Sequence, residues 1–342
     1  MSDRKRTIRE WVLNKLHITR RPVVKVYNGF GDQDLLLLYG HVLKQSPLPK
    51  RKFKKNFWSN TMSLLRLFFV EPYKNVTIKM EWAGTLLETT TDEDGFFKFE
   101  WQSPELLAPG WHKVVVELHH SRYNNVSGEG KILVPHPTQY AFISDIDDTF
   151  LISHSSNLRK RLYVLLTENA KTRRPFDGVT RHYQLLAHAN THSEAPNPFF
   201  YVSSSEWNLY DYINDFKKHH GLPEGVYLLN QMKHWNEILK TGQTKHSGKF
   251  IRIARIVNEF PHHKFILLGD DTQQDPEIYQ KIVEGFSDRI LCVYLRHVGR
   301  WKKPEVERRA SEIRKLGVEV CYFKKSEEAI EHSQAIGLIQ DV

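Results

Sequence analysis

A short apolar run that ends in acidic residues constrains the fold of this chain more than any other feature. Tyr140 to Ile143 is closely followed by Asp145 and Asp147. Such a run predicts a buried parallel strand, and the carboxyl end of such a strand is where α/β sheets bind ligands. Carboxylates two residues apart point to the same side of an extended backbone. Each can then have its own task, Asp145 as nucleophile and Asp147 as general acid and base.

Two other interpretations of the same pattern are a helix cap and a calcium loop. An acidic turn between a strand and a helix can cap the helix without any chemistry, and the short motif alone does not decide between capping and catalysis. A calcium loop needs Gly at its sixth position and Glu at its twelfth. Those positions are Phe150 and Ser156 here, which disfavours calcium.

Length and composition favour two domains and an anionic partner. The chain has 342 residues, 40% of them hydrophobic, and a net charge of +9. The charge fits a membrane surface, a nucleic acid or a phosphorylated substrate. Cys292 and Cys321 fall in different predicted strands, which excludes a disulfide framework and fits a reducing compartment. No signal peptide or membrane-spanning run is present, so we expect a cytoplasmic protein, with peripheral attachment to the membrane left open.

The first part of the chain is expected to form an amphipathic helix and then a small β-sandwich. Apolar residues at helical spacing predict the helix within residues 1–21. Residues 22–134 contain short β-branched or aromatic runs separated by turns such as Asn28-Gly29 and Asp94-Gly95, which is typical of a sandwich. The expected strands are 23–27, 35–43, 76–82, 86–91, 96–101 and 114–118.

A basic and apolar insertion, residues 49–70, interrupts this β pattern. Lys50–Trp58 is cationic and aromatic, and an apolar stretch follows it. It could lie on an anionic bilayer, where each exposed Lys or Arg contributes about 1 kcal/mol. A solvated loop followed by a helix packed on the sandwich is the simpler interpretation, and we favour it. No nucleic-acid-binding motif is visible, so nucleic acid is not an expected partner.

The second part, residues 138–342, alternates strands and helices after the proline-rich linker Val134–Pro137. This alternation predicts a doubly wound parallel sheet in an α/β domain. The expected strands are 140–143, 198–205, 226–229, 264–271, 290–295 and 318–323. The expected helices are 158–166, 178–189, 207–219, 247–257, 305–316 and 327–336.

Polar side chains stand at several of these strand ends and helix starts. Ser203 to Ser205 follow a buried strand and precede a helix, an arrangement that can cradle phosphate or simply cap the helix. Lys249 lies in the first turn of a helix, where the dipole disfavours a cation unless the lysine faces an anion. An ordinary surface lysine is the alternative. Asp270 and Asp271 end another strand, and Asp275 follows them.

The order of these elements resembles the four-motif signature of the haloacid dehalogenase superfamily of phosphatases. The second part further resembles the family of the fungal actin-patch phosphatidate phosphatase and its bacterial relatives, and residues 22–134 look like the β-rich leader of the bacterial members. The matching segments are Ser144–Thr149, Pro175–Val179, Tyr201–Ser205 with Trp207–Tyr210, and Gly269-Asp270 with Gln273 and Asp275–Tyr279.

The resemblance implies a Rossmann-like fold and a Mg²⁺-dependent phosphatase that works through an aspartyl-phosphate. Asp145 and Asp147 would be catalytic. The remaining implied roles are phosphate binding by Thr149, Ser203, Ser204 and Lys249, magnesium binding by Asp145, Asp147 and Asp270, and support of the site by Asp271 and Asp275. Lys245 is the alternative to Lys249. The implied substrate is phosphatidate or a related lipid phosphate. The alternatives are a phosphatase on a protein or soluble phosphomonoester, and a non-catalytic lipid-binding module.

The chain departs from the pattern of this family at a few positions. Gly248 stands where relatives often carry His, and Glu206 where Pro is usual. Asp271-Thr272 replaces Ser-Gly, Arg296-His297-Val298 replaces Arg-Asp-Val, and Ser153-His154 replaces Thr-Gly. None of these changes removes a residue of the catalytic signature. The last one bears on substrate contacts and therefore on lipid specificity.

Overall fold

The computed structural model describes residues 21–44, 71–123, 126–146, 149, 175–191, 194–230 and 245–340. The predicted helix within 1–21, the insertion 49–70 with Lys50–Trp58, and the predicted helix 158–166 lie outside these residues, apart from Arg21. The described residues up to Val134 form one compact unit, and those from Pro135 form another.

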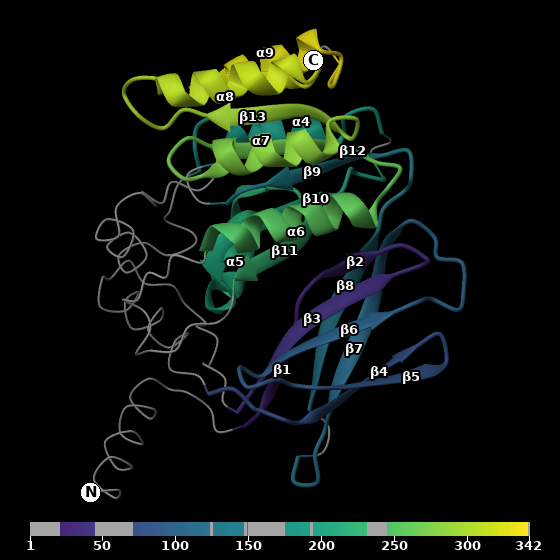
Figure 1. The fold of residues 1–342 in the computed structure, drawn as a ribbon. Coiled ribbons are helices and arrows are strands. Elements are labelled where there is room, and N and C mark those ends of the chain that lie inside the picture. The colour runs from purple at the N-terminus through teal and green to yellow at the C-terminus, as the bar shows by residue number, and fades with distance from the viewer. Residues whose placement is uncertain are drawn as a thin grey trace, which may run out of the picture. The chain divides into compact units, whose positions relative to one another are not determined.

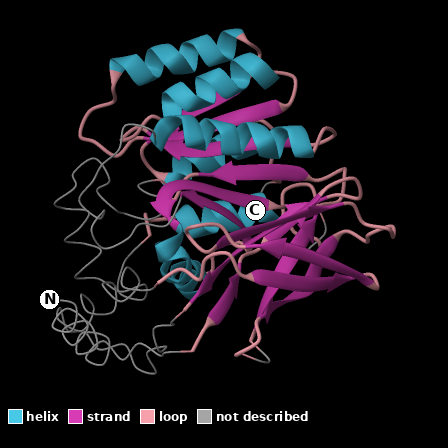
Figure 2. Ribbon diagram, turned by 60° about the horizontal axis from the view of Figure 1, so that its bottom comes forward, coloured by secondary structure: helices cyan, strands magenta, loops and turns pink. Residues whose placement is uncertain are grey.

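The first unit is built from strands, and Figure 2 shows no helix among its described residues. Its strands are β1 Val23–Val26, β2 Gly29–Gly31, β3 Leu36–Leu43, β4 Thr77–Trp82, β5 Thr85–Thr90, β6 Phe96–Trp101, β7 Gly110–His119 and β8 Ser127–Val134. They follow the order β1-β3-β2-β8-β7-β4-β5, with β6 bonded to β3. All pairs are antiparallel except β2 with β8.

The strands of this unit, which we expected to form a small sandwich, are linked through β3 into one hydrogen-bonded sheet. β3 pairs with β6 along one edge and with β1 and β2 along the other. Every residue of β3 is buried. Leu36 and Leu38 of β3 share one core with Ile78 of β4 and Val116 of β7. β3 therefore joins the strands of the first unit and contributes to its hydrophobic core.

Two strands of this unit were missed in the sequence. β2 begins at Gly29, which we had assigned to a turn with Asn28. A Cβ atom at Gly29 would collide with the carbonyl of Leu37, so glycine here permits close strand pairing rather than only a turn. β8 begins with Ser127 and contains glycines at 128 and 130, which weaken any strand pattern. Its pairing with β7 compensates for this low propensity.

The second unit is an α/β structure with one parallel sheet, as expected. Its strands are β9 Tyr140–Ser144, β10 Phe199–Glu206, β11 Gly225–Asn230, β12 Lys264–Asp270, β13 Ile290–Arg296 and β14 Glu319–Phe323. The order in the sheet is β11-β10-β9-β12-β13-β14. Successive strands therefore lead outward in one direction from β9 and in the other direction from β12. Ligands bind where the strand order diverges in this way, at the carboxyl ends of the strands.

Helices connect and cover these strands (Figure 1). They are α4 Val179–Ala187, α5 Tyr210–His220 after the short 3-10 helix η1 Trp207–Leu209, α6 Lys245–Glu259, α7 Asp275–Phe286, α8 Pro304–Lys315 and α9 Ser326–Ala335. α7 packs against both α6 and α8, and α4 packs against α9. α7 was missed, although Pro276 in its first turn and the buried Ile278 and Ile282 are helix signals. Among the described helices, none combines the length and apolarity needed to cross a bilayer.

Candidate active site

A buried lysine connects two carboxylates at the carboxyl end of the parallel sheet. Lys249 Nζ of α6 lies 2.7 Å from Asp145 Oδ1, just after β9, and also donates to Asp275 Oδ1 at the start of α7. All three side chains are buried. Burial alone would lower the pKa of Lys249, but the Asp145 and Asp275 carboxylates outweigh it and raise this pKa. The lysine is therefore a permanent cation at neutral pH.

Asp270 brings a third carboxylate into the same cluster. It ends β12, which lies next to β9 with Leu268 opposite Ser144. Thr149 Oγ1 lies 3.3 Å from Asp270 Oδ2 and 3.4 Å from Asp145 Oδ2, so it joins the two carboxylates. Burial, and then the nearby Asp275 carboxylate, raise the pKa of Asp270 to about 8.

The excess of negative charge in this cluster suits a metal cation. One carboxylate oxygen from each of Asp145, Asp270 and Asp275 lies within 4.8 Å of the other two, and all three residues are buried. Lys249 can balance only one of the three charges. The cluster therefore binds either a proton or a further cation, and buried carboxylate oxygens are the ligands that hard divalent ions such as Mg²⁺ prefer.

Gly269 explains how Asp275 comes so close to β12. A Cβ atom at this position would lie 2.7 Å from Asp275 Oδ2 and 2.7 Å from the ring of Tyr279. Because glycine leaves this space open, Asp275 Oδ2 can approach the backbone N–H of Asp270 to 3.4 Å. The start of α7 is thereby held against the end of β12.

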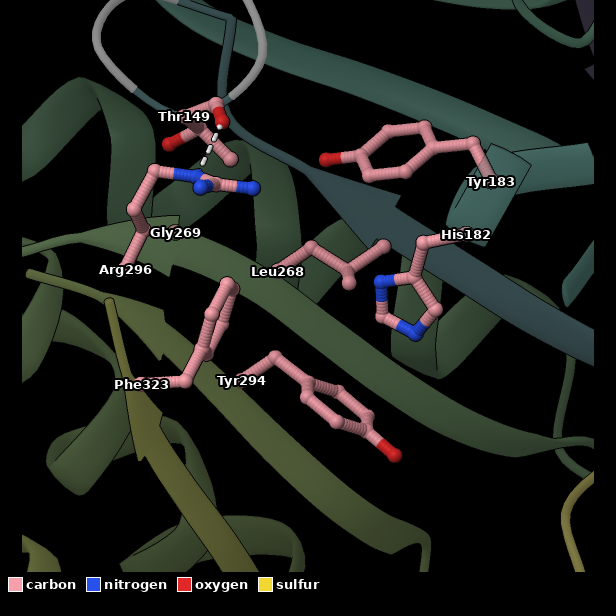
Figure 3. Close-up of a pocket in the computed structure, with 8 residues that line it drawn as sticks. All are labelled: Thr149, His182, Tyr183, Leu268, Gly269, Tyr294, Arg296 and Phe323. Atoms are coloured by element: carbon pink, nitrogen blue, oxygen red, sulfur yellow. Dashed lines mark hydrogen bonds between the residues drawn. The ribbon is translucent and has the colours of Figure 1, made fainter. Parts of the chain in front are cut away.

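Arg296 supports the cluster from a small pocket beside it (Figure 3). Its Nε donates to the Thr149 carbonyl at 3.0 Å, and its Nη2 donates to Ser326 Oγ at 2.9 Å. The guanidinium lies between two rings, 4.7 Å from the centroid of Phe176 and 4.8 Å from that of Phe323. Burial lowers the pKa of Arg296 to about 10, so it stays charged. We missed this residue, although an arginine directly after the predicted buried strand 290–295 is a usable signal.

Asp271 belongs to a neighbouring network rather than to the carboxylate cluster. Its Oδ2 lies 2.6 Å from His297 Nδ1 and accepts from the Tyr322 hydroxyl at 2.6 Å. Its Oδ1 accepts from the Val298 N–H at 3.2 Å. Asp271 therefore connects β12 to the loop after β13.

The remaining predicted site residues differ in how far the structure describes them. Ser203 is buried in β10, beside β9, and its Oγ accepts from the Ser205 N–H at 2.9 Å. Ser204 is half-buried. Arg252 of α6 donates to the Ser203 carbonyl at 3.2 Å. Asp147 and the side chain of Lys245 lie outside the described residues, so their predicted roles stay predictions.

Comparison with known proteins identifies relatives of this part of the chain. Residues 140–297 match the family model described as the catalytic domain of phosphatidate phosphatase APP1. The phosphatidate phosphatase APP1 of Saccharomyces cerevisiae is 28% identical over 160 residues, which are 47% of this chain and 26% of that protein. An uncharacterized protein of Schizosaccharomyces pombe is 24% identical over 164 residues, 46% of this chain and 25% of that protein.

The chain therefore spans about a quarter of the length of the curated relatives that it matches. Among solved structures, a carbohydrate acetylesterase from Xanthomonas citri aligns with 93% of this chain and 75% of its own, at 8% identity and a TM-score of 0.33. That score is too low to inform either fold or function. The segment matched by the family model contains Asp145, Lys249, Asp270 and Asp275.

Proposed function

Because residues 140–297 belong to an APP1-like phosphatase family, we propose that the chain is a Mg²⁺-dependent phosphoric monoester hydrolase acting through an aspartyl-phosphate. The observation that carries this proposal is the buried cluster in which Lys249 meets Asp145 beside Asp270 and Asp275. It supplies a nucleophile, a fixed cation and metal ligands at one point. We assign phosphatidate or a related lipid phosphate as the substrate.

We assign the second unit to the Rossmann-like, doubly wound fold of the haloacid dehalogenase class. Counted along the chain, the strand order is 3-2-1-4-5-6, which is that of doubly wound dinucleotide-binding sheets. The proposed catalytic domain is 138–342, preceded by the β domain 22–134 and the helix within 1–21. A cytoplasmic location, peripheral at the membrane, agrees with a lipid phosphate as substrate.

Asp145 is the proposed nucleophile. Its carboxylate attacks the phosphorus of the substrate, the P–O bond to the alkoxide breaks, and a phosphoryl group is left on Asp145. Asp147 donates a proton to the departing alkoxide. It then takes a proton from the water molecule that hydrolyses the aspartyl-phosphate, and phosphate is released.

The surrounding residues hold the phosphoryl oxygens and the metal. Lys249 stays protonated, so it can stabilise negative charge as phosphorus changes bonds, with Ser203, Ser204 and Thr149 as hydrogen-bond donors. Asp275 fixes the Lys249 ammonium in place. Asp145, Asp270 and the backbone carbonyl of Asp147 would hold Mg²⁺, which supplies charge screening between the carboxylate nucleophile and the phosphate dianion.

Two other functions are alternatives to a lipid phosphatase, and a substrate panel distinguishes them. A phosphatase on a protein or a soluble phosphomonoester would use the same cluster with a different substrate. A lipid-binding module would need no general acid such as Asp147.

The experiment is a substrate panel, in which phosphate release is measured with Mg²⁺ on phosphatidate in mixed micelles and on soluble phosphomonoesters. Release from phosphatidate supports the proposal, release from soluble esters only would replace the substrate, and release from none would favour the binding module.

A further inference from the structure

A short loop beside the carboxylate cluster is fixed at both ends by Asp271. This loop, residues 298–303, lies in the connection between β13 and α8. It leaves β13 at the carboxyl end of the parallel sheet, the edge at which Asp145 follows β9 and Asp270 ends β12. The loop therefore lies on the side of the second unit where the proposed chemistry takes place.

Hydrogen bonds hold both ends of the loop in place. At its start, the Val298 N–H donates to Asp271 Oδ1 at 3.2 Å. At its end, Lys303 Nζ donates to the Asp271 carbonyl, and the Lys303 N–H donates to the Tyr322 hydroxyl at 3.1 Å. That hydroxyl in turn donates to Asp271 Oδ2 at 2.6 Å. Both ends of the loop are thus tied to the residue that follows Asp270.

The tip of the loop carries an exposed tryptophan that is flanked by basic residues. Trp301 is 76% exposed. The Arg300 guanidinium carbon lies 5.5 Å from the centroid of the Trp301 ring. Lys302 is also exposed, and its Nζ donates to the Tyr322 carbonyl at 2.8 Å. The loop sequence Val-Gly-Arg-Trp-Lys-Lys contains no acidic residue, and the next acids along the chain are Glu305 and Glu307 in the first turn of α8.

We propose that the 298–303 loop docks the catalytic unit on an anionic lipid bilayer. Tryptophan favours the headgroup level of a bilayer, where its ring contacts apolar chains and its N–H stays hydrated. The Arg300 guanidinium beside it is attracted to anionic headgroups, and Lys302 and Lys303 add to the positive charge of the loop. The choice of a lipid surface over other polyanions rests on the proposed function. A single tryptophan in a tight loop also offers no series of aromatic rings for base stacking.

Docking through this loop would hold the cluster at the membrane surface. Asp271 anchors the loop and directly follows the proposed metal ligand Asp270, so hydrogen bonds connect the lipid-contacting loop to the edge of the proposed site. Turnover of a lipid phosphate in a membrane would then depend on the loop, whereas turnover of a soluble ester would not.

The test is sedimentation of the full chain with phosphatidylcholine vesicles, with and without phosphatidylserine. The variants are Trp301→Ala and Arg300→Gln, neither of which touches the carboxylate cluster. The matched controls on α8 and just after it are Arg308→Gln and Leu316→Ala, which remove an exposed charge and an exposed apolar side chain. We expect binding only with phosphatidylserine, about fivefold weaker for Arg300→Gln (~1 kcal/mol) and weaker still for Trp301→Ala, with both controls unchanged.

The outcomes separate this inference from the proposed function. Absence of wild-type binding, or equal binding by the loop variants and the wild type, would overturn the docking surface whatever the activity. Loop-dependent binding without phosphate release from any substrate would keep the docking surface and reject the phosphatase. Phosphate release on vesicles that falls in the loop variants, with unchanged release from a soluble ester, would support both.

Discussion

Lys249 Nζ and Asp145 Oδ1 lie 2.7 Å apart, with only 3% and 1% of their side chains exposed. Removing one partner from a buried ion pair leaves an uncompensated charge, whose burial is strongly unfavourable. The pair therefore contributes both to the stability of the second unit and to the proposed chemistry. These two contributions can be measured separately.

Replacing the lysine should destabilise the fold. We expect Lys249→Met to lower the free energy of unfolding by about 3–5 kcal/mol, because Asp145 and Asp275 would then repel each other without a cation. In the double variant with Asp145→Asn part of that loss should be recovered, with a coupling energy of about 1–3 kcal/mol. Urea denaturation of the four proteins measures it. Strictly additive effects would show that the two side chains do not interact.

Magnesium should stabilise the folded chain even without substrate. The three buried carboxylates exceed the single charge of Lys249, so a divalent cation relieves their repulsion. At a Mg²⁺ concentration of 100 times Kd the stabilisation would be about 2.7 kcal/mol, seen as a higher Tm. Asp270→Asn should lose this response, whereas Asp288→Asn, an exposed aspartate outside the cluster, should keep it. An equal Tm shift in both variants would place the metal elsewhere.

Arg296 should affect turnover through the position of Thr149. In Arg296→Lys the ammonium could not donate to both the Thr149 carbonyl and Ser326 Oγ as the guanidinium does, so Thr149 would shift relative to Asp145 and Asp270. We expect kcat to fall by 10- to 100-fold with little change in KM, because small misplacements of reacting groups have effects of about this size.

A matched control for Arg296 exists at the opposite end of the same strand. Arg289 precedes β13, donates to the backbone carbonyls of His263 and Phe260, and lies 5.7 Å from the ring centroid of Phe265. Arg289→Lys removes similar contacts far from the carboxylate cluster, so it should lower stability and leave kcat intact. Equal losses of kcat in both variants would mean that Arg296 acts only through stability.

The buried His182 side chain should make the folded chain less stable in acid. Burial, then the charges of Arg296 and His332, lower its pKa from 6.5 to about 3. The unfolded chain therefore binds a proton between about pH 6.5 and 3 that the folded chain does not, so folding stability falls as the pH falls through this window. His182→Asn should reduce this slope by up to about 1.4 kcal/mol per pH unit. Urea midpoints from pH 7 to 4 would test it, and parallel curves for the two proteins would refute it.

Much of the second unit could be predicted from the sequence, because its strands are continuous apolar runs. Parallel strands end at one edge of their sheet, which is why Asp145 and Asp270, at the ends of separate runs, were expected to share one edge. The structure brings both together with Lys249, although their catalytic roles stay predictions. The helix α7 was missed even though its pattern is visible.

Other features depend on pairings that no local pattern encodes. The pairing of β3 with β1, β2 and β6 joins residues far apart in the chain. Asp271 was expected to support the site, but its contacts with His297 and Tyr322 could not be foreseen. Both partners come from other strands or their ends, so their meeting follows from tertiary structure alone. The contact of Arg296 with the Thr149 carbonyl is of the same kind.

The most direct test of the central claim is phosphate release from phosphatidate by the wild type and by Asp145→Asn, each with Mg²⁺ and with EDTA. We predict release by the wild type with Mg²⁺ alone. The Asp145→Asn protein should fold, because Lys249 keeps its contact with Asp275, and it should release no phosphate under either condition. Release by a folded Asp145→Asn protein at the wild-type rate would contradict an aspartyl-phosphate at Asp145.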